Sequence, residues 1–247
     1  MLDKAIGTQK WRTFFGHIYN WYINELIGCF ATSSDVLIRQ FYPNKKFQGM
    51  EHEVCDGLIL WENTAALCEY KGTRLTTRAR AGIVISESID AIEKMIGSKD
   101  SGVGQLAKNI RLALAGNLVA SGNELIDLRR YRRILPVLIC QEEVAVNHAV
   151  RHYLQELFTK FLTQEPAIDV SQLGPLLLFS TRDIELFEQL VQIDGAENLI
   201  CKYADFVHEN PRDPMGIFHS YGHHKYAGQP QPQGYVNTKL MSGSTGN

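Results

Sequence analysis

The fold and the chemistry of this 247-residue chain are decided by one stretch, Cys55-Asp56-Gly57-Leu58-Ile59-Leu60-Trp61-Glu62-Asn63-Thr64-Ala65-Ala66-Leu67-Cys68-Glu69-Tyr70-Lys71-Gly72. Two apolar segments, residues 54–61 and 65–71, are separated by a short polar tip at residues 62–64. Apolar runs of this length around a tight polar turn are typical of a β-hairpin. We therefore predict two antiparallel strands here.

Three charged side chains of the hairpin are predicted to share one face. Glu69 and Lys71 are two residues apart on a strand, so both project from the same side. A two-residue loop pairs Asp56 with Glu69, and a four-residue loop pairs it with Lys71. Either loop brings Asp56 to that face, with opposed Cβ atoms about 4.5–5.5 Å apart. A three-residue loop would instead place Asp56 opposite Tyr70, on the wrong face unless a bulge corrects it.

The pairing of two carboxylates with one ammonium group has two interpretations. Asp56 and Glu69 would repel each other at this distance unless a cation lay between them, and oxygen ligands of this kind suit Mg²⁺ or Mn²⁺. Such an ion can lower the pKa of bound water, while Lys71 would offset negative charge in the transition state. The alternative is a salt bridge at the rim of the sheet. About one Glu-x-Lys triplet is expected by chance from the composition, so the hairpin context carries the argument.

This arrangement resembles the PD-(D/E)xK nuclease superfamily, in which an aspartate on the second core strand is followed across a hairpin by (D/E)-x-K. The resemblance implies a restriction-endonuclease-like fold and a DNA-hydrolysing enzyme, with DNA preferred over RNA as the substrate. It implies that Asp56, Glu69 and the backbone carbonyl of Tyr70 hold Mg²⁺ or Mn²⁺, and that Lys71 serves the attacking water. Stand-alone proteins of this appearance are often associated with phage defence or mobile elements.

Two further segments resemble the superfamily, one of them imperfectly. Residues 16–22, Gly-His-Ile-Tyr-Asn-Trp-Tyr, are similar to a first-helix pattern G-x-x-F-E-x-Y, but Asn20 stands in place of the acid. Asn20 could supply a neutral oxygen, or another acid could substitute for it: Glu25, Glu51 or Glu53. Gly104-Gln105-Leu106 is similar to a glutamine motif after the Glu-x-Lys strand, so Gln105 would face the site. The missing acid keeps an alternative open, a weak or inactive nuclease-fold protein that binds nucleic acid or a partner protein.

Basic residues beside the hairpin are candidates for contacts with phosphate groups. Four of them are predicted to line a nucleic-acid groove: Arg74, Arg78, Lys108 and Arg111. Arg80 belongs to the same group. The run Arg129–Arg133 is either a DNA-backbone contact or a charged loop leading into the next strand. The histidines near the carboxyl end have no standard zinc spacing.

The order of predicted elements indicates an α/β fold with a central mixed β-sheet flanked by helices. Residues 1–210 are expected to form a single domain and the Pro-, Gly- and Gln-rich residues 211–247 a flexible tail. Helices are predicted at residues 8–31, 86–116 with a break at 97–102, 147–162, from 180 onward, and 196–208. Besides the hairpin, strands are predicted at residues 36–41, 134–140 and 176–179.

Composition bounds the location and the partners of the protein. With 45% hydrophobic and 21% charged residues, the chain is typical of a soluble globular protein. A net charge of −2 argues against a broad non-specific coat on nucleic acid but leaves room for a local basic groove. Five scattered cysteines and the absence of a predicted signal peptide or membrane span favour the cytoplasm. A homodimer or a complex with partner proteins stays open.

Overall fold

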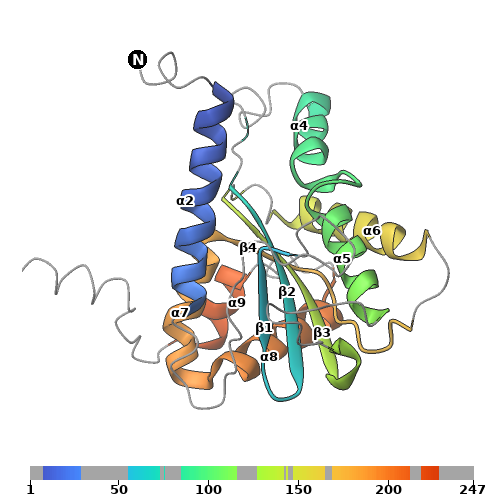
Figure 1. The fold of residues 1–247 in the computed structure, drawn as a ribbon. Coiled ribbons are helices and arrows are strands. Elements are labelled where there is room, and N and C mark those ends of the chain that lie inside the picture. The colour runs from blue at the N-terminus through green and yellow to red at the C-terminus, as the bar shows by residue number, and fades with distance from the viewer. Residues whose placement is uncertain are drawn as a thin grey trace, which may run out of the picture.

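A four-stranded mixed sheet lies at the centre of the computed structural model, with the strands in the order β1-β2-β3-β4 (Figure 1). The strands are β1 (Gly57–Leu60), β2 (Thr64–Lys71), β3 (Arg133–Cys140) and β4 (Leu177–Ser180). β1 is antiparallel to β2, whereas β2, β3 and β4 run parallel to one another. The structure describes residues 8–28, 55–72, 75, 85–115, 127–141, 143, 147–164, 169–211 and 218–227. The predicted α/β class with a mixed central sheet is confirmed, and the predicted strand at 36–41 lies outside the described residues.

The β1–β2 hairpin has the two-residue loop that was one of the predicted alternatives. Leu60 pairs with Ala65, and the amide of Trp61 donates to the carbonyl of Thr64 at 2.9 Å. Extending this register places Asp56 opposite Glu69. The length of the loop therefore determines which charged residues lie opposite each other at the far end of the hairpin.

Helices connect and cover the strands. They are α2 (Thr8–Gly28), α4 (Ile85–Ile92), the π-helical turn η2 (Glu93–Gly97), α5 (Val103–Leu114), the 3₁₀ turn η3 (Leu128–Arg130), α6 (His148–Thr163), α7 (Thr181–Asp194), α8 (Ala196–Glu209) and α9 (Phe218–Lys225). The predicted break at residues 97–102 separates η2 from α5. The helix predicted from residue 180 onward is α7, which begins with a capping box between Ser180 and Asp183.

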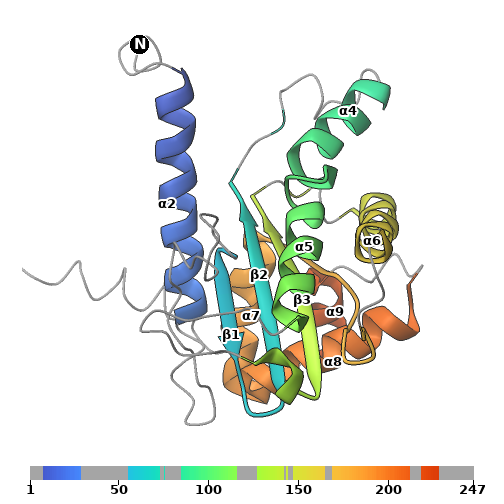
Figure 2. The same cartoon turned by 45° about the vertical axis from the view of Figure 1, so that its right-hand side comes forward.

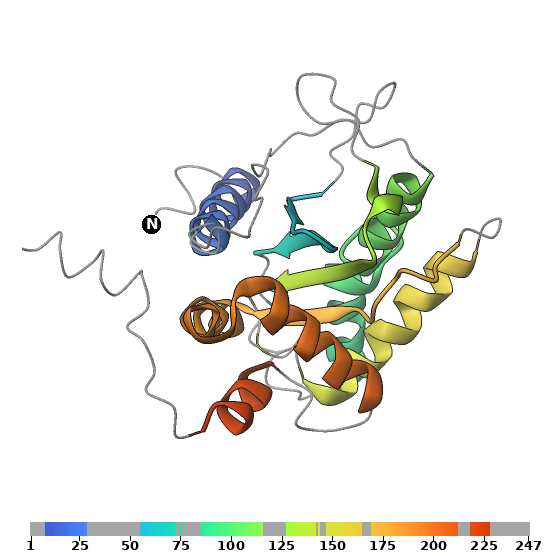
Figure 3. The same ribbon diagram turned by 90° about the horizontal axis from the view of Figure 1, so that it is seen from below.

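Two helical layers bury the two faces of the sheet (Figure 3). α5 and α6 pack on one face, against Leu58 and Leu67 among others. α2, α7, α8 and α9 pack on the other face, against Ile59 and Cys68 among others. Because side chains alternate along a strand, Asp56, Glu69 and Lys71 belong to the α5–α6 face.

The first half of α2 is less buried than the sequence suggests. Apolar residues recur at helical spacing along the predicted helix 8–31, but Phe14, Phe15 and Ile18 are 52%, 40% and 42% exposed. Only the second half, from Tyr19 to Ile27, packs into the core. Figure 2 shows the reason: the amino-terminal part of α2 extends past the carboxyl end of β2, on the opposite side from α4.

The helix α9 was not predicted, because the last helix was expected at residues 196–208. It lies within the segment 211–247, so the expectation of a flexible tail is corrected for residues 218–227. Phe218 is fully buried in an aromatic cluster, with ring centroids 5.2 Å from Phe179 and 5.0 Å from Tyr203. The backbone amide of His219 also donates to Asp183 at 2.9 Å. Within the described residues, no helix combines the length and the apolar character needed to cross a bilayer.

Candidate active site

A cavity of about 900 Å³ lies beside the carboxyl end of β2, between α2 and the α4–α5 segment. The residues predicted as catalytic meet there. Its lining includes Asn20, Asp56, Glu69, Tyr70, Lys71 and Gln105. Four of these are the predicted catalytic residues, and they come from three separate elements of the fold.

The carboxylate of Asp56 is fixed by two donors. The backbone amide of Tyr70 donates to its Oδ2 at 2.7 Å, and Nδ2 of Asn20 donates to its Oδ1 at 3.1 Å. Asn20 stands on α2, whose second half docks onto the sheet. Asn20 therefore orients Asp56 through its amide nitrogen, in the place where the resemblance had implied an acid.

Glu69 and Lys71 form an ion pair within the same strand. Nζ of Lys71 lies 2.8 Å from Oε1 of Glu69, whose side chain is only 1% exposed. Nζ also donates to Oε1 of Gln105 on α5 at 3.2 Å. A buried carboxylate is costly unless it is paired, so Lys71 stabilises Glu69 while Gln105 helps to hold the ammonium group in position.

Gln105 reaches Lys71 because α5 begins close against the preceding loop. Gly102 has a positive φ of 55°, a conformation that residues with a Cβ rarely adopt. Gly104 packs so closely on Ser98 and Lys99 that a Cβ there would overlap their backbone atoms. The prediction that Gln105 faces the site agrees with its place in the cavity lining.

The donor atoms in this cavity suit a hard divalent cation. The described residues contain no group of three or more His, Cys, Asp or Glu side chains arranged to hold a metal. Mg²⁺, however, is commonly bound by one or two carboxylates, with water and substrate phosphate completing its shell. Asp56 and Glu69 supply two carboxylates. The N–H and C=O groups of one strand residue point to the same side, so the carbonyl of Tyr70 leaves β2 on the side of Asp56.

The side chain of Tyr70 points away from the cavity. It packs in the core on the α2–α7 face of the sheet. Burial, and then the neighbouring Cys68 and Asp56, raise the pKa of the Tyr70 hydroxyl well above its usual range. The phenol is therefore neutral, and only the backbone of Tyr70 serves the cavity.

The predicted nucleic-acid contacts on α5 are not part of the cavity. Lys108 is exposed and does not line it. Arg111 donates through its guanidinium to the carbonyl of Leu162 at the end of α6, at 2.6 Å. Arg111 thus ties α5 to α6, which corrects its predicted place beside the metal ligands. The other predicted contacts, Arg74 and Arg78, lie outside the described residues, as does Arg80.

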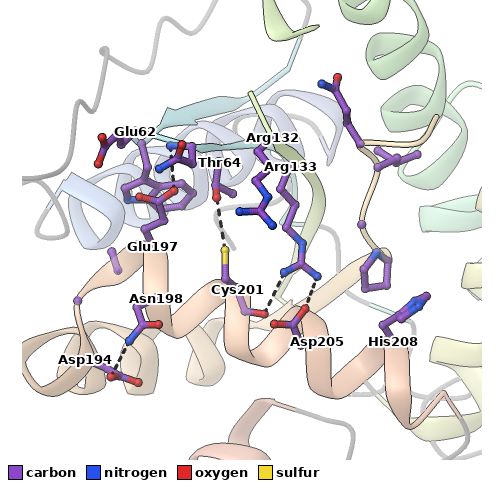
Figure 4. Close-up of a pocket in the computed structure, with 18 of the residues that line it drawn as sticks. Glu62, Thr64, Arg132, Arg133, Asp194, Glu197, Asn198, Cys201, Asp205 and His208 are labelled. Atoms are coloured by element: carbon purple, nitrogen blue, oxygen red, sulfur yellow. Dashed lines mark hydrogen bonds and ion pairs between the residues drawn. The ribbon is translucent and has the colours of Figure 1, made fainter. Parts of the chain in front are cut away.

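The basic run 129–133 leads into the amino-terminal end of β3, at the end of the sheet opposite to Lys71. Figure 4 shows Arg132 and Arg133 there, beside α8. Arg132 and Arg133 line a second cavity with the hairpin tip and α8, and Arg133 pairs there with Asp205 at 2.7 Å. Arg129 pairs with Asp127. The eight-residue strand β2 separates this end from Lys71 by about 23 Å. These arginines therefore lie too far from Lys71 to contact a group bound in the first cavity.

Several residues of the first cavity were missed from the sequence. Lys94, Ser101 and Gln141 line it, as do the aromatic residues Trp11 and Phe15 of α2. Single polar residues outside any motif carry no signal in one sequence. Trp11 and Phe15 did leave a signal in the sequence, because the first half of α2 has more large apolar residues than one buried helix face needs.

The chain matches no protein-family model, no curated protein and no solved structure. The argument for function therefore depends on the geometry and the chemistry of the cavity.

Proposed function

We propose that this protein is a divalent-metal-dependent nuclease of the PD-(D/E)xK type, with a restriction-endonuclease-like fold, that hydrolyses phosphodiester bonds in DNA. One observation carries the proposal: Asp56, Glu69, Lys71 and Gln105 line a single cavity at the carboxyl end of β2. A rim salt bridge would leave these groups at an open surface. Instead Glu69 is buried, and Asp56 is held by two donors.

Each residue has a separate part in the proposed reaction. Asp56, Glu69 and the carbonyl of Tyr70 would hold Mg²⁺ or Mn²⁺, which supplies charge neutralisation at the phosphate and a more acidic water. Asn20 and the amide of Tyr70 fix the carboxylate of Asp56. Lys71, held by Glu69 and Gln105, presents an ammonium group that orients the attacking water and offsets negative charge developing on the phosphate.

The proposal is tested by the metal dependence of DNA cleavage. Purified protein is expected to cut linear, circular or single-stranded DNA in Mg²⁺ or Mn²⁺ and to be inactive in EDTA. Product formation on denaturing gels measures this, and an RNA strand of the same sequence tests the preference for DNA. Failure to cut any of these substrates with either metal would contradict the proposal.

One observation favours a second function, binding of nucleic acid without hydrolysis. Asn20 occupies the position of the helix acid, and both carboxylate oxygens of Asp56 already accept hydrogen bonds. Under this alternative, DNA would bind equally well with and without divalent metal and would not be cut. Cleavage that is lost on replacement of Glu69 would exclude it.

A further inference from the structure

Aromatic side chains of α2 form one wall of the candidate active-site cavity. Trp11 and Phe15 both line it. Their ring centroids are 5.0 Å apart in an edge-to-face arrangement, and Trp11 also stacks on Phe14 at 5.7 Å. Phe14 and Phe15 remain about half exposed. A group of exposed aromatic rings beside a polar site marks a binding surface.

The aromatic wall continues from the residues that hold Asp56. Asn20 and Phe15 are five residues apart on the same helix, or about 7.5 Å along its axis, and Trp11 is about 13.5 Å from Asn20. Gly16 also lines the cavity, and it adds no side chain between Asn20 and the aromatic rings. A strand with one phosphate group at Asp56 and Glu69 would therefore bring its neighbouring nucleotides to these rings.

Among the lining residues of the cavity that the structure describes, positive and negative side chains are equal in number. The cations Lys71 and Lys94 are matched by Asp56 and Glu69, and Lys71 is already paired. Basic contacts with phosphate groups contribute to the affinity for duplex and single strand alike, so the aromatic wall is the feature that separates the two. Duplex bases present only their edges in the grooves, whereas unpaired bases expose faces that stack on aromatic rings.

We infer that the cavity takes single-stranded DNA, with unpaired bases stacked on Trp11 and Phe15. This inference rests on the proposed nuclease function and assigns the substrate form of the same site. The carboxylates and Lys71 would act on the phosphodiester, while α2 would contribute affinity through the bases.

The inference is tested by fluorescence anisotropy in Ca²⁺, with labelled oligothymidine, its duplex with oligodeoxyadenosine, and an abasic strand of equal length as probes. The single strand is expected to bind at least about tenfold more tightly than the other two probes. The double variant Trp11→Ala/Phe15→Ala is expected to lose at least about thirtyfold in affinity for the single strand. Its affinity for the duplex should not change.

Trp21→Ala is the matched control, because Trp21 stands on the same helix, is 62% exposed and does not line the cavity. It should bind like the wild type. Trp11→Phe keeps an aromatic face and should retain most of the affinity for the single strand. If Trp11 had only a structural role, Trp11→Phe and Trp11→Ala would bind the single strand equally. Equal binding of the normal and abasic strands, or a preference for duplex, would overturn the inference. Tighter binding of oligouridine would overturn the assignment of DNA.

Cleavage in Mg²⁺ separates this inference from the nuclease proposal. If the wild type cuts duplex and single strand equally and the double variant is unaffected, the inference fails while the nuclease proposal stands. If the binding results are as expected but no strand is cut in Mg²⁺ or Mn²⁺, the nuclease proposal fails and base stacking is supported alone.

Discussion

Replacing Glu69 by glutamine is expected to reduce the rate of Mg²⁺-dependent DNA cleavage by about 10²- to 10³-fold. Glutamine has the same shape, and its amide oxygen can still accept the hydrogen bond from Lys71, so the fold should be kept. What is lost is one of the two carboxylate charges in the cavity. Initial rates of cleavage at equal protein concentration measure the effect.

Glu62→Gln is the control for this variant. Glu62 lies at the exposed tip of the same hairpin and lines the second cavity, not the first. Its replacement removes the same charge at the opposite end of the sheet and should leave the rate within about twofold of the wild type. Mg²⁺ should also raise the Tm of the wild type and of Glu62→Gln, but not of Glu69→Gln. Wild-type rates in Glu69→Gln would contradict the assignment of the site.

Replacing Gly104 by alanine is expected to lower the free energy of unfolding by about 3 kcal/mol. A Cβ at this position would overlap the carbonyl oxygen of Ser98 and the Cα of Lys99. These are backbone atoms, which cannot move aside as a flexible side chain can. The start of α5 would have to shift, which would withdraw Gln105 from Lys71 and reduce cleavage as well. Urea denaturation followed by circular dichroism measures the loss.

Gly16→Ala is the matched comparison. Gly16 lies within α2, and a Cβ built there meets nothing within 4 Å. Alanine at this position should stabilise the protein by up to about 1 kcal/mol, since glycine is the weaker helix former. A Gly104→Ala protein as stable as the wild type would show that the loop before α5 is not constrained in the way described.

The geometry of the hairpin could be predicted because it depends on local rules. Strand alternation places Glu69 and Lys71 on one face, and an even-length loop brings Asp56 to them. The sequence left loops of two, three and four residues open. The structure selects the two-residue loop, in which Trp61 bonds to Thr64.

The partners of these residues could not be predicted, because they come from distant parts of the chain. Asn20 was interpreted as a missing acid, and its bond to Asp56 depends on how α2 docks against the sheet. Arg111 was assigned to a phosphate groove. Its guanidinium instead donates to the backbone carbonyl of Leu162 at the end of α6. Side-chain contacts of this kind have no signature in a single sequence.

The sequence misled about which side chains are buried in two segments, residues 218–227 and the first half of α2. Residues 218–227 were assigned to a flexible tail because the flanking residues are rich in Pro, Gly and Gln. Phe218 and Tyr221 nevertheless join the core through an aromatic cluster. Apolar residues recur at helical spacing along α2. The helix extends past the sheet, which leaves Phe15 at the cavity and Phe14 exposed, with neither of them in the core.

The most direct test of the proposed active site is to locate Mn²⁺ by anomalous X-ray scattering from crystals grown with the metal. We expect one strong anomalous peak in the first cavity, bonded to carboxylate oxygens of Asp56 and Glu69 and to the carbonyl of Tyr70. The same peak should be absent from crystals of Glu69→Gln. A cavity without a peak at saturating Mn²⁺, with Lys71 still bound to Glu69, would contradict the metal-dependent nuclease and leave these residues as a buried ion pair.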